Sequence, residues 1–205
     1  MKKMRKIFAV LLSLAMVLGM SMTSFAANSG NDKIFGTADD TATIKVNGIN
    51  NETDIQVNAY KVVEAKYEGA GNTFSGYNSL YPNVIKQDMV KADLTTLSAE
   101  QLTSLANAVA ADTTKTAIAL TNINGTTTWK ADVAAGTYLV LVSNTEAHSY
   151  NPMVVSAYYV NKDGKTDIYE GAVDLTTTEA NAKKSDAPTI DKKLQIQTEM
   201  IMVIL

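Results

Sequence analysis

The sequence predicts a mainly β protein with one or two helices, and three observations lead to this fold class. Short stretches alternate apolar and polar residues, which is the period of a half-buried strand. Asn and Gly punctuate these stretches and mark turns. Apolar residues make up 46% of the chain, yet much of the remainder is Thr and Asn rather than charge. This mixture favours strands joined by tight turns.

The N-terminus has the three-part pattern of a secretory signal peptide. Basic residues precede an apolar run over residues 7–20, and small side chains at Ser24 and Ala26 follow. We predict a signal peptide over residues 1–26, cleaved after Ala26 so that Ala27 begins the exported chain. The apolar run is shorter than the ~20 residues that span a bilayer.

The net charge indicates which partners the chain could bind, and the cysteine content indicates how an exported domain could be stabilised. Loss of residues 1–26 removes four of eighteen basic residues and none of the 21 acidic residues, so the formal charge moves from −3 to −7. An acidic chain does not favour binding to nucleic acid or to anionic lipid. The chain has no cysteine, so an exported domain must be stabilised without disulfides.

Five strands and one helix carry the fold prediction. We expect a helix over residues 98–111, because Ser98 and Gln101 form a capping box and apolar side chains then recur on one face. This helix should pack outside the sheets. A shorter helical stretch is expected after Pro82. The predicted strands are residues 42–46, 57–63, 137–142, 153–160 and 172–178.

Connections between these elements follow from the turn residues. Asn47-Gly48 should join the first two strands as a hairpin, and the glycines of residues 68–76 indicate a mobile loop. Residues 137–142 are too apolar to alternate, which favours a strand buried on both faces. Asp163-Gly164 predicts a further hairpin.

The domain organisation is predicted from shifts in composition. Residues 181–188 are polar, contain lysine and end at a proline, as linkers do, while the last residues have no pattern and indicate an out-of-frame tail. A shifted reading frame should then encode further β domains. The predicted division is 27–40 flexible lead-in, 41–180 β domain, 181–188 linker, 189–193 start of a missing second domain, and 194–205 tail.

Residues that could carry enzymatic chemistry are scarce. His148 is the only histidine, and with no cysteine beside it the sequence predicts neither a catalytic triad nor a zinc site. Aromatic residues could line a sugar site, but beside apolar strands they more often pack in the core. We therefore predict no enzyme, no cofactor and no metal. The aromatic residues concerned are Trp129, Tyr138, Tyr150, Tyr158 and Tyr159.

The ordered set of segments resembles the N-terminal domain of Gram-positive sortase-assembled pilins, the isopeptide-forming fimbrial subunits. The segments that carry the resemblance are residues 42–46, 57–63, 135–140, 151–156 and 183–193. The resemblance implies an immunoglobulin-like or CNA-B-like sandwich that stacks on the next subunit of a fibre. It also implies surface localisation, on a pilus or the cell wall, with other pilin subunits and a sortase as partners.

The resemblance also implies roles for particular lysines. In such pilins a lysine near the end of this domain attacks the sortase-bound threonine of a neighbouring subunit, and Lys183 or Lys184 occupies that place, without the usual preceding Tyr-Pro. Lys192 or Lys193 matches the lysine of an internal Lys–Asn isopeptide bond in the missing next domain. Lys45 has no acid and Asn of matching context in the sequence. The alternative function is a secreted adhesin that binds a host glycan or protein.

Overall fold

The computed structural model describes residues 20–21, 36–69, 73–91, 97–145, 148–161 and 172–186. The described elements are two short-to-medium helical segments and thirteen strands, several of only two or three residues. They are β1 (Met20–Ser21), β2 (Thr41–Asn47), β3 (Gln56–Glu68), β4 (Thr73–Ser79), η1 (Gln87–Lys91), α2 (Ala99–Ala111), β5 (Ala117–Ala119), β6 (Thr121–Asn122), β7 (Trp129–Ala134), β8 (Gly136–Ser143), β9 (His148–Tyr150), β10 (Met153–Asn161), β11 (Ala172–Thr177), β12 (Glu179–Asn181) and β13 (Lys184–Asp186).

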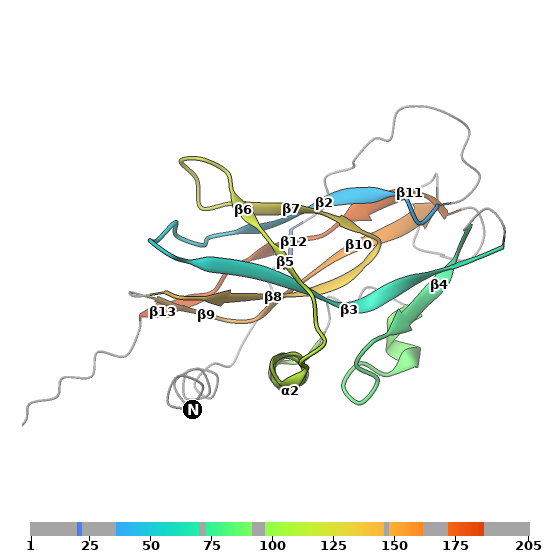
Figure 1. The fold of residues 1–205 in the computed structure, drawn as a ribbon, viewed down its shortest axis with the longest axis horizontal. Helices are drawn as coiled ribbons and strands as arrows, with labels where there is room; N and C mark the ends of the chain where they lie inside the picture. Colours follow the sequence, from blue (N-terminus) through green and yellow to red (C-terminus); the bar gives the residue numbers. More distant parts are fainter. Residues whose placement is uncertain are drawn as a thin grey trace, which may run out of the picture.

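Two sheets form the layers of a sandwich. One sheet has the order β1-β12-β2-β7-β6, and the other has the order β11-β10-β8-β3-β4, with β5 added to β3. Figure 1 shows β2 and β7 in one layer and β3 and β8 in the other. Strands β13 and β9 form a separate two-stranded sheet. The mainly β fold class is confirmed.

The core lies between the two sheets and follows from the alternation of β2. Ala42, Ile44 and Val46 are buried there, whereas the intervening residues of β2 are partly exposed. They pack in one cluster with Tyr138 of β8 and Tyr159 of β10. Alternate side chains of a strand point to opposite faces, so the sequence pattern of β2 predicts which face meets the other sheet.

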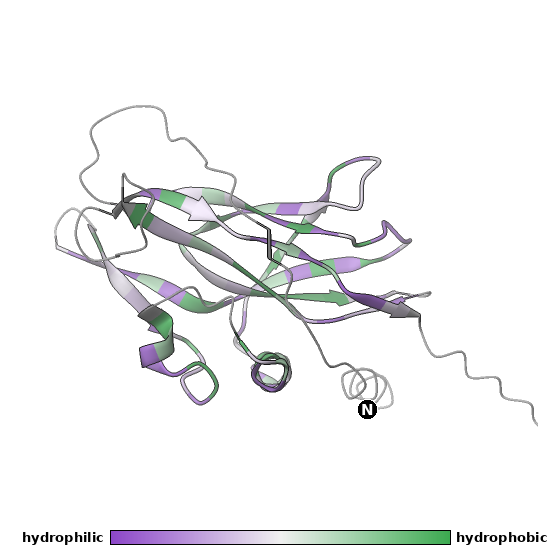
Figure 2. Ribbon diagram, turned by 180° about the vertical axis from the view of Figure 1, so that it is seen from behind, coloured by the Kyte–Doolittle hydropathy of each residue, from purple (hydrophilic) through white to green (hydrophobic). Residues whose placement is uncertain are grey.

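The outer face of the second sheet is covered by α2 (Figure 1). Leu105, Ala106 and Val109 of the helix are buried against residues of β3, β8 and β10. Ser98 caps the helix as predicted: its Oγ accepts from Gln101 N at 3.2 Å, and Gln101 Oε1 accepts from Ser98 N at 2.9 Å. In Figure 2 the helix carries both apolar and polar residues around its circumference.

The double cover explains why β8 does not alternate. Tyr138 and Val140 belong to the core between the sheets, while Leu139 belongs to the cluster under α2. All three side chains are fully buried. The prediction of a strand buried on both faces is therefore confirmed.

The predicted hairpin between the first two strands is wrong, because β2 and β3 belong to different sheets. The chain turns at residues 53–54, where Asp54 has φ of +62°, and not at the predicted Asn47-Gly48, although Gly48 has φ of +83°. Just after Gly48, Ile49 is buried, its N–H bonds to Thr127 O at 3.1 Å, and its C=O accepts from Trp129 Nε1 at 3.1 Å. These contacts keep the chain beside the start of β7, in the first sheet, until the turn that precedes β3.

The loop expected over residues 68–76 is also wrong in part, since β4 begins at Thr73 and pairs with β3. Gly76 lies inside β4 with φ of +138°, and the register shifts between Lys66 and Tyr67. Glycine inside a strand marks such an irregularity as readily as a loop. The helical stretch after Pro82 is the short 3-10 helix η1.

Several predictions fall on residues that are not described, including the Asp163-Gly164 hairpin and the signal cleavage point at Ala26 and Ala27. Of the predicted signal peptide only Met20 and Ser21 are described, and they pair with β12. Within the described part of the chain, no helix has the length and apolar character needed to cross a membrane.

Candidate functional site: the junction of the first and last strands

Strand β12 pairs with β2 in parallel, and this is the one parallel pairing among the described strands. The register sets Glu179 beside Lys45, Ala180 beside Val46 and Asn181 beside Asn47. The ladder continues past β12, because Ala182 N donates to Asn47 O at 2.7 Å. The start and the end of the predicted 41–180 domain are thereby joined by backbone hydrogen bonds.

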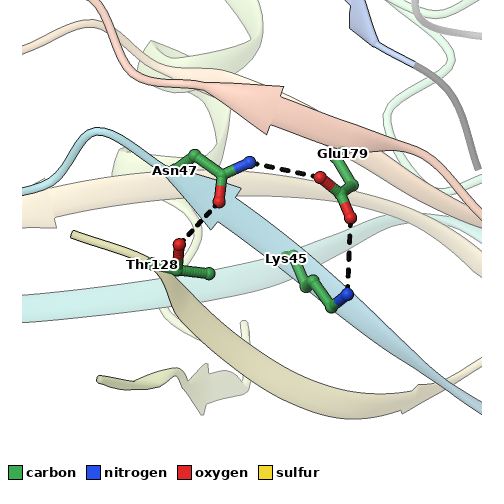
Figure 3. A network of polar contacts seen from close by, with 4 residues as sticks. All are labelled: Lys45, Asn47, Thr128 and Glu179. Atoms are coloured by element: carbon green, nitrogen blue, oxygen red, sulfur yellow. Dashed lines mark hydrogen bonds and ion pairs between the residues drawn. The ribbon is translucent and has the colours of Figure 1, made fainter. Parts of the chain in front are cut away.

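Side chains on the outward face of this pair form a polar network (Figure 3). Lys45 Nζ lies 3.5 Å from Glu179 Oε1, and Asn47 Nδ2 donates to Glu179 Oε2 at 3.2 Å. The Asn47 amide oxygen accepts from Thr128 Oγ1 at 2.8 Å. The network therefore ties β2 to β12 and to the loop before β7.

The sequence did not indicate these partners of Lys45, because Glu179 is remote in the chain and Asn47 was interpreted only as a turn residue. An internal Lys–Asn isopeptide bond, as the pilin resemblance describes it, requires a buried acid. Here Lys45 and Glu179 keep 32% and 21% of their side-chain surface exposed. The inward positions beside them are the apolar Ile44 and Ala180. The geometry is that of an ion pair on the surface of the sandwich.

Both candidate cross-linking lysines lie directly after this junction and are exposed. Lys183 presents its carbonyl to Asn151 N at 3.1 Å, while Lys184 begins β13. Lys184 Nζ donates to Asn50 Oδ1 at 3.3 Å. The structure thus brings the two lysines to one end of the sandwich, next to the loop that follows β2. Lys192 and Lys193 lie outside the described residues.

The segment expected as a linker carries strand β13, which pairs with β9. Ser185 Oγ and Ser149 Oγ are 2.8 Å apart, and Tyr150 OH accepts from Asn50 N at 3.0 Å. Residues up to Asp186 are therefore attached to the end of the sandwich. The domain boundaries given above remain a prediction.

Most of the aromatic residues considered for a sugar site belong to the core. Tyr138 and Tyr159 have no exposed surface, and Trp129 is 6% exposed. Tyr138 OH donates to Ala134 O at 2.8 Å, and Tyr159 OH donates to Thr37 O at 2.8 Å. Tyr150 is partly exposed, but its hydroxyl is engaged with Asn50. Among the described residues no three His, Cys, Asp or Glu side chains come together as metal ligands.

Comparison with known proteins assigns the fold to a family. The model of the T6 antigen Ig-like domain matches residues 39–187. This chain belongs to the T6 antigen Ig-like domain family. The matched range begins two residues before β2 and ends just after β13, so it contains the junction and every strand of the sandwich except β1. The immunoglobulin-like sandwich expected from the sequence is confirmed.

One similar solved structure is the T6 backbone pilin of serotype M6 Streptococcus pyogenes, described as a modular three-domain structure with variable loops and extensions. The identity is 24% and the TM-score 0.49, with coverage of 72% of this chain. The chain spans only 28% of that pilin. No curated protein matches this chain.

Proposed function

We propose that this protein is a subunit of a sortase-assembled surface pilus, exported by its signal peptide, in which this domain stacks on neighbouring subunits. The observation that supports the proposal most is the match of the T6 antigen Ig-like domain family over residues 39–187. The role is structural rather than enzymatic. A pilus subunit needs a rigid module with a defined end for the next module, and the β2–β12 junction followed by β13 provides such an end.

The proposal includes a lysine that joins one subunit to the next. Its amine attacks the carbonyl carbon of the threonine held as an acyl group on the sortase, an amide bond forms, and the sortase leaves as the free enzyme. The attacking amine must be unprotonated, and its proton passes to the leaving group or to solvent. An exposed lysine at the end of the domain can reach a threonine carried by another subunit.

Lys183 and Lys184 differ in how they are held. The side chain of Lys184 donates to Asn50 at 3.3 Å and must leave that contact to react. Lys183 is fixed through its backbone carbonyl, which accepts from Asn151. Because the pilin resemblance places the linking lysine at this position, we propose Lys183 as the principal nucleophile and Lys184 as the neighbouring candidate.

The test uses the chain as it stands, the cognate pilin sortase and a donor peptide with a Leu-Pro-x-Thr-Gly signal. We expect a covalent adduct whose peptide map places the new amide on Lys183. Lys183→Ala should remove most of the adduct, and Lys184→Ala should remove little. Lys130→Ala, an exposed lysine of β7, is the matched control. Undiminished adduct formation in both junction variants would overturn the proposed linkage.

A further inference from the structure

The chain contains two Asn-Gly dipeptides, Asn47-Gly48 and Asn124-Gly125. In this dipeptide the backbone nitrogen of glycine can reach the side-chain carbonyl of asparagine, because glycine has no Cβ to block the approach. A β-branched aliphatic residue precedes each asparagine, Val46 in one case and Ile123 in the other. The two sites are therefore chemically similar, and their surroundings must decide which one reacts.

Asn47 is held at both ends of its side-chain amide. Its Nδ2 donates to Glu179 Oε2 at 3.2 Å, and its Oδ1 accepts from Thr128 Oγ1 at 2.8 Å. Its backbone belongs to β2, between β7 and β12, and its carbonyl accepts from Ala182 N at 2.7 Å. Attack by the Gly48 nitrogen requires the amide to turn away from these partners, at the cost of both side-chain hydrogen bonds.

Asn124 lies in the exposed turn between β6 and β7. Thr126 N donates to Ile123 O at 3.0 Å and closes the turn, and Gly125 has φ of +75° with nothing within 4 Å of a Cβ position. In the part of the chain that the structure describes, no hydrogen bond ends on the Asn124 side chain or on Gly125 N. The amide of Asn124 can therefore rotate toward the Gly125 nitrogen without losing a partner.

We propose that Asn124 is a site of spontaneous deamidation in the folded protein, and that the Lys45–Asn47–Glu179–Thr128 network protects Asn47 from the same reaction. The Gly125 nitrogen loses its proton and bonds to Asn124 Cγ, and ammonia leaves, which gives a cyclic succinimide. Water then opens the ring at either carbonyl to give aspartate or isoaspartate. The reaction consumes one water, releases one ammonia and involves no redox change.

The product changes the loop that supports the network. Each conversion adds one negative charge to an acidic chain, and the isoaspartate form also inserts a methylene into the backbone of the turn. Thr128, which donates to Asn47, follows in the same loop. This inference does not depend on the proposed role in a pilus.

The experiment is incubation of the folded full chain in mildly alkaline buffer, followed by peptide mapping with mass spectrometry and enzymatic methylation of isoaspartate. Asn124 should convert at least about tenfold faster than Asn47, because Asn47 must first break two hydrogen bonds. In denaturant the two rates should converge, since the protection of Asn47 is structural. Equal rates in the folded chain, or an Asn124 that stays intact while it converts in denaturant, would overturn the proposal.

Three variants sharpen the test. Asn124→Gln should remove the signal from its own peptide and leave the slow rate at Asn47 unchanged. Glu179→Ala frees Nδ2 of Asn47, and Thr128→Val frees its Oδ1, so either change should accelerate conversion at Asn47 several-fold while Asn124 keeps its rate. If Asn47 stayed fully protected in both Glu179→Ala and Thr128→Val, the hydrogen bonds of its side chain would not be what protects it.

Discussion

The two outward faces of the sandwich differ in what covers them. The face formed by β3, β8 and β10 lies under α2 and buries a second apolar cluster. The face formed by β2, β7 and β12 carries the polar network and has partly exposed side chains. The burial patterns of the strands reflect this difference. Strand β2 alternates because one of its sides is partly exposed, and β8 does not alternate because residues 136–140 are buried on both sides.

The largest change in the free energy of unfolding is expected on the covered face, which β3, β8 and β10 form under α2. Leu105 has no exposed surface and packs with Val62, Leu139 and Val154. Leu105→Ala should lower the free energy of unfolding by about 2–5 kcal/mol, from lost apolar burial and the cavity that remains. Urea unfolding measures the change.

A control substitution on the same helix tests whether the loss of stability is specific to the buried position. Ser104 is exposed one residue before Leu105, and Ser104→Ala should change the free energy of unfolding by no more than about 0.5 kcal/mol. A cost below about 1 kcal/mol for Leu105→Ala would mean that α2 is not a structural cover.

Local sequence signals predicted the covered face well. The capping box of Ser98 and Gln101 and the apolar stripe of α2 lie within a few turns of helix, so one short window contains all the information. The face formed by β2, β7 and β12, here called the open face, was predicted poorly, because its contacts join residues far apart in sequence. Nothing near Lys45 indicates that Glu179 will lie in register with it.

Turn signals show the same limit. Asn47-Gly48 predicted a hairpin turn, but the turn lies at residues 53–54, and a turn signal does not say which sheet the next strand joins. Ile49, just after Gly48, is instead buried and hydrogen-bonded to Thr127 and to Trp129 of the first sheet. The family resemblance predicted the sandwich fold. Neither the turn signals nor the resemblance predicted the hydrogen bond between Lys184 and Asn50.

Alkaline pH should lower the free energy of unfolding through Tyr81, a partly buried tyrosine that packs against the apolar cluster under α2. Tyr81 OH donates to Asp112 Oδ2 at 2.9 Å, and burial, together with this bond and the Asp112 charge, raises the pKa of Tyr81 to about 12 from 10.0. Between these values the unfolded chain loses the phenolic proton and the folded chain keeps it. The free energy of unfolding should therefore fall as pH rises from 10.0 to about 12.

The measurement is stability against pH for the wild type and for Tyr81→Phe, which should show a shallower fall. Burial also raises the pKa values of Tyr138 and Tyr159, so part of the decline persists in the variant. Burial lowers the pKa of Lys61 from 10.5, which contributes with the opposite sign just below that value. Identical profiles for both proteins would contradict the role assigned to Tyr81.

The smallest change in the free energy of unfolding is expected on the open face. The test there is which of two charge-removing substitutions costs more. Lys45 lies between Glu179 on β12 and Lys130 on β7, because both are its partners in the strand registers. Like charges opposite each other in a sheet destabilise it, and an opposite charge offsets them. Glu179→Gln removes the offset and leaves the two lysines facing each other, whereas Lys45→Met removes the repulsion together with the ion pair.

Glu179→Gln should therefore lower the free energy of unfolding by about 0.2–1 kcal/mol, the range of exposed ion pairs, and Lys45→Met should cost less. The difference between the two variants should shrink in high salt, because the charges are partly exposed and screened. Urea unfolding of both single variants and the double variant, at low and high salt, gives the comparison. If Lys45→Met proved the more costly change, packing of the lysine stem across the strands, and not charge, would be the main contribution of this residue to the open face.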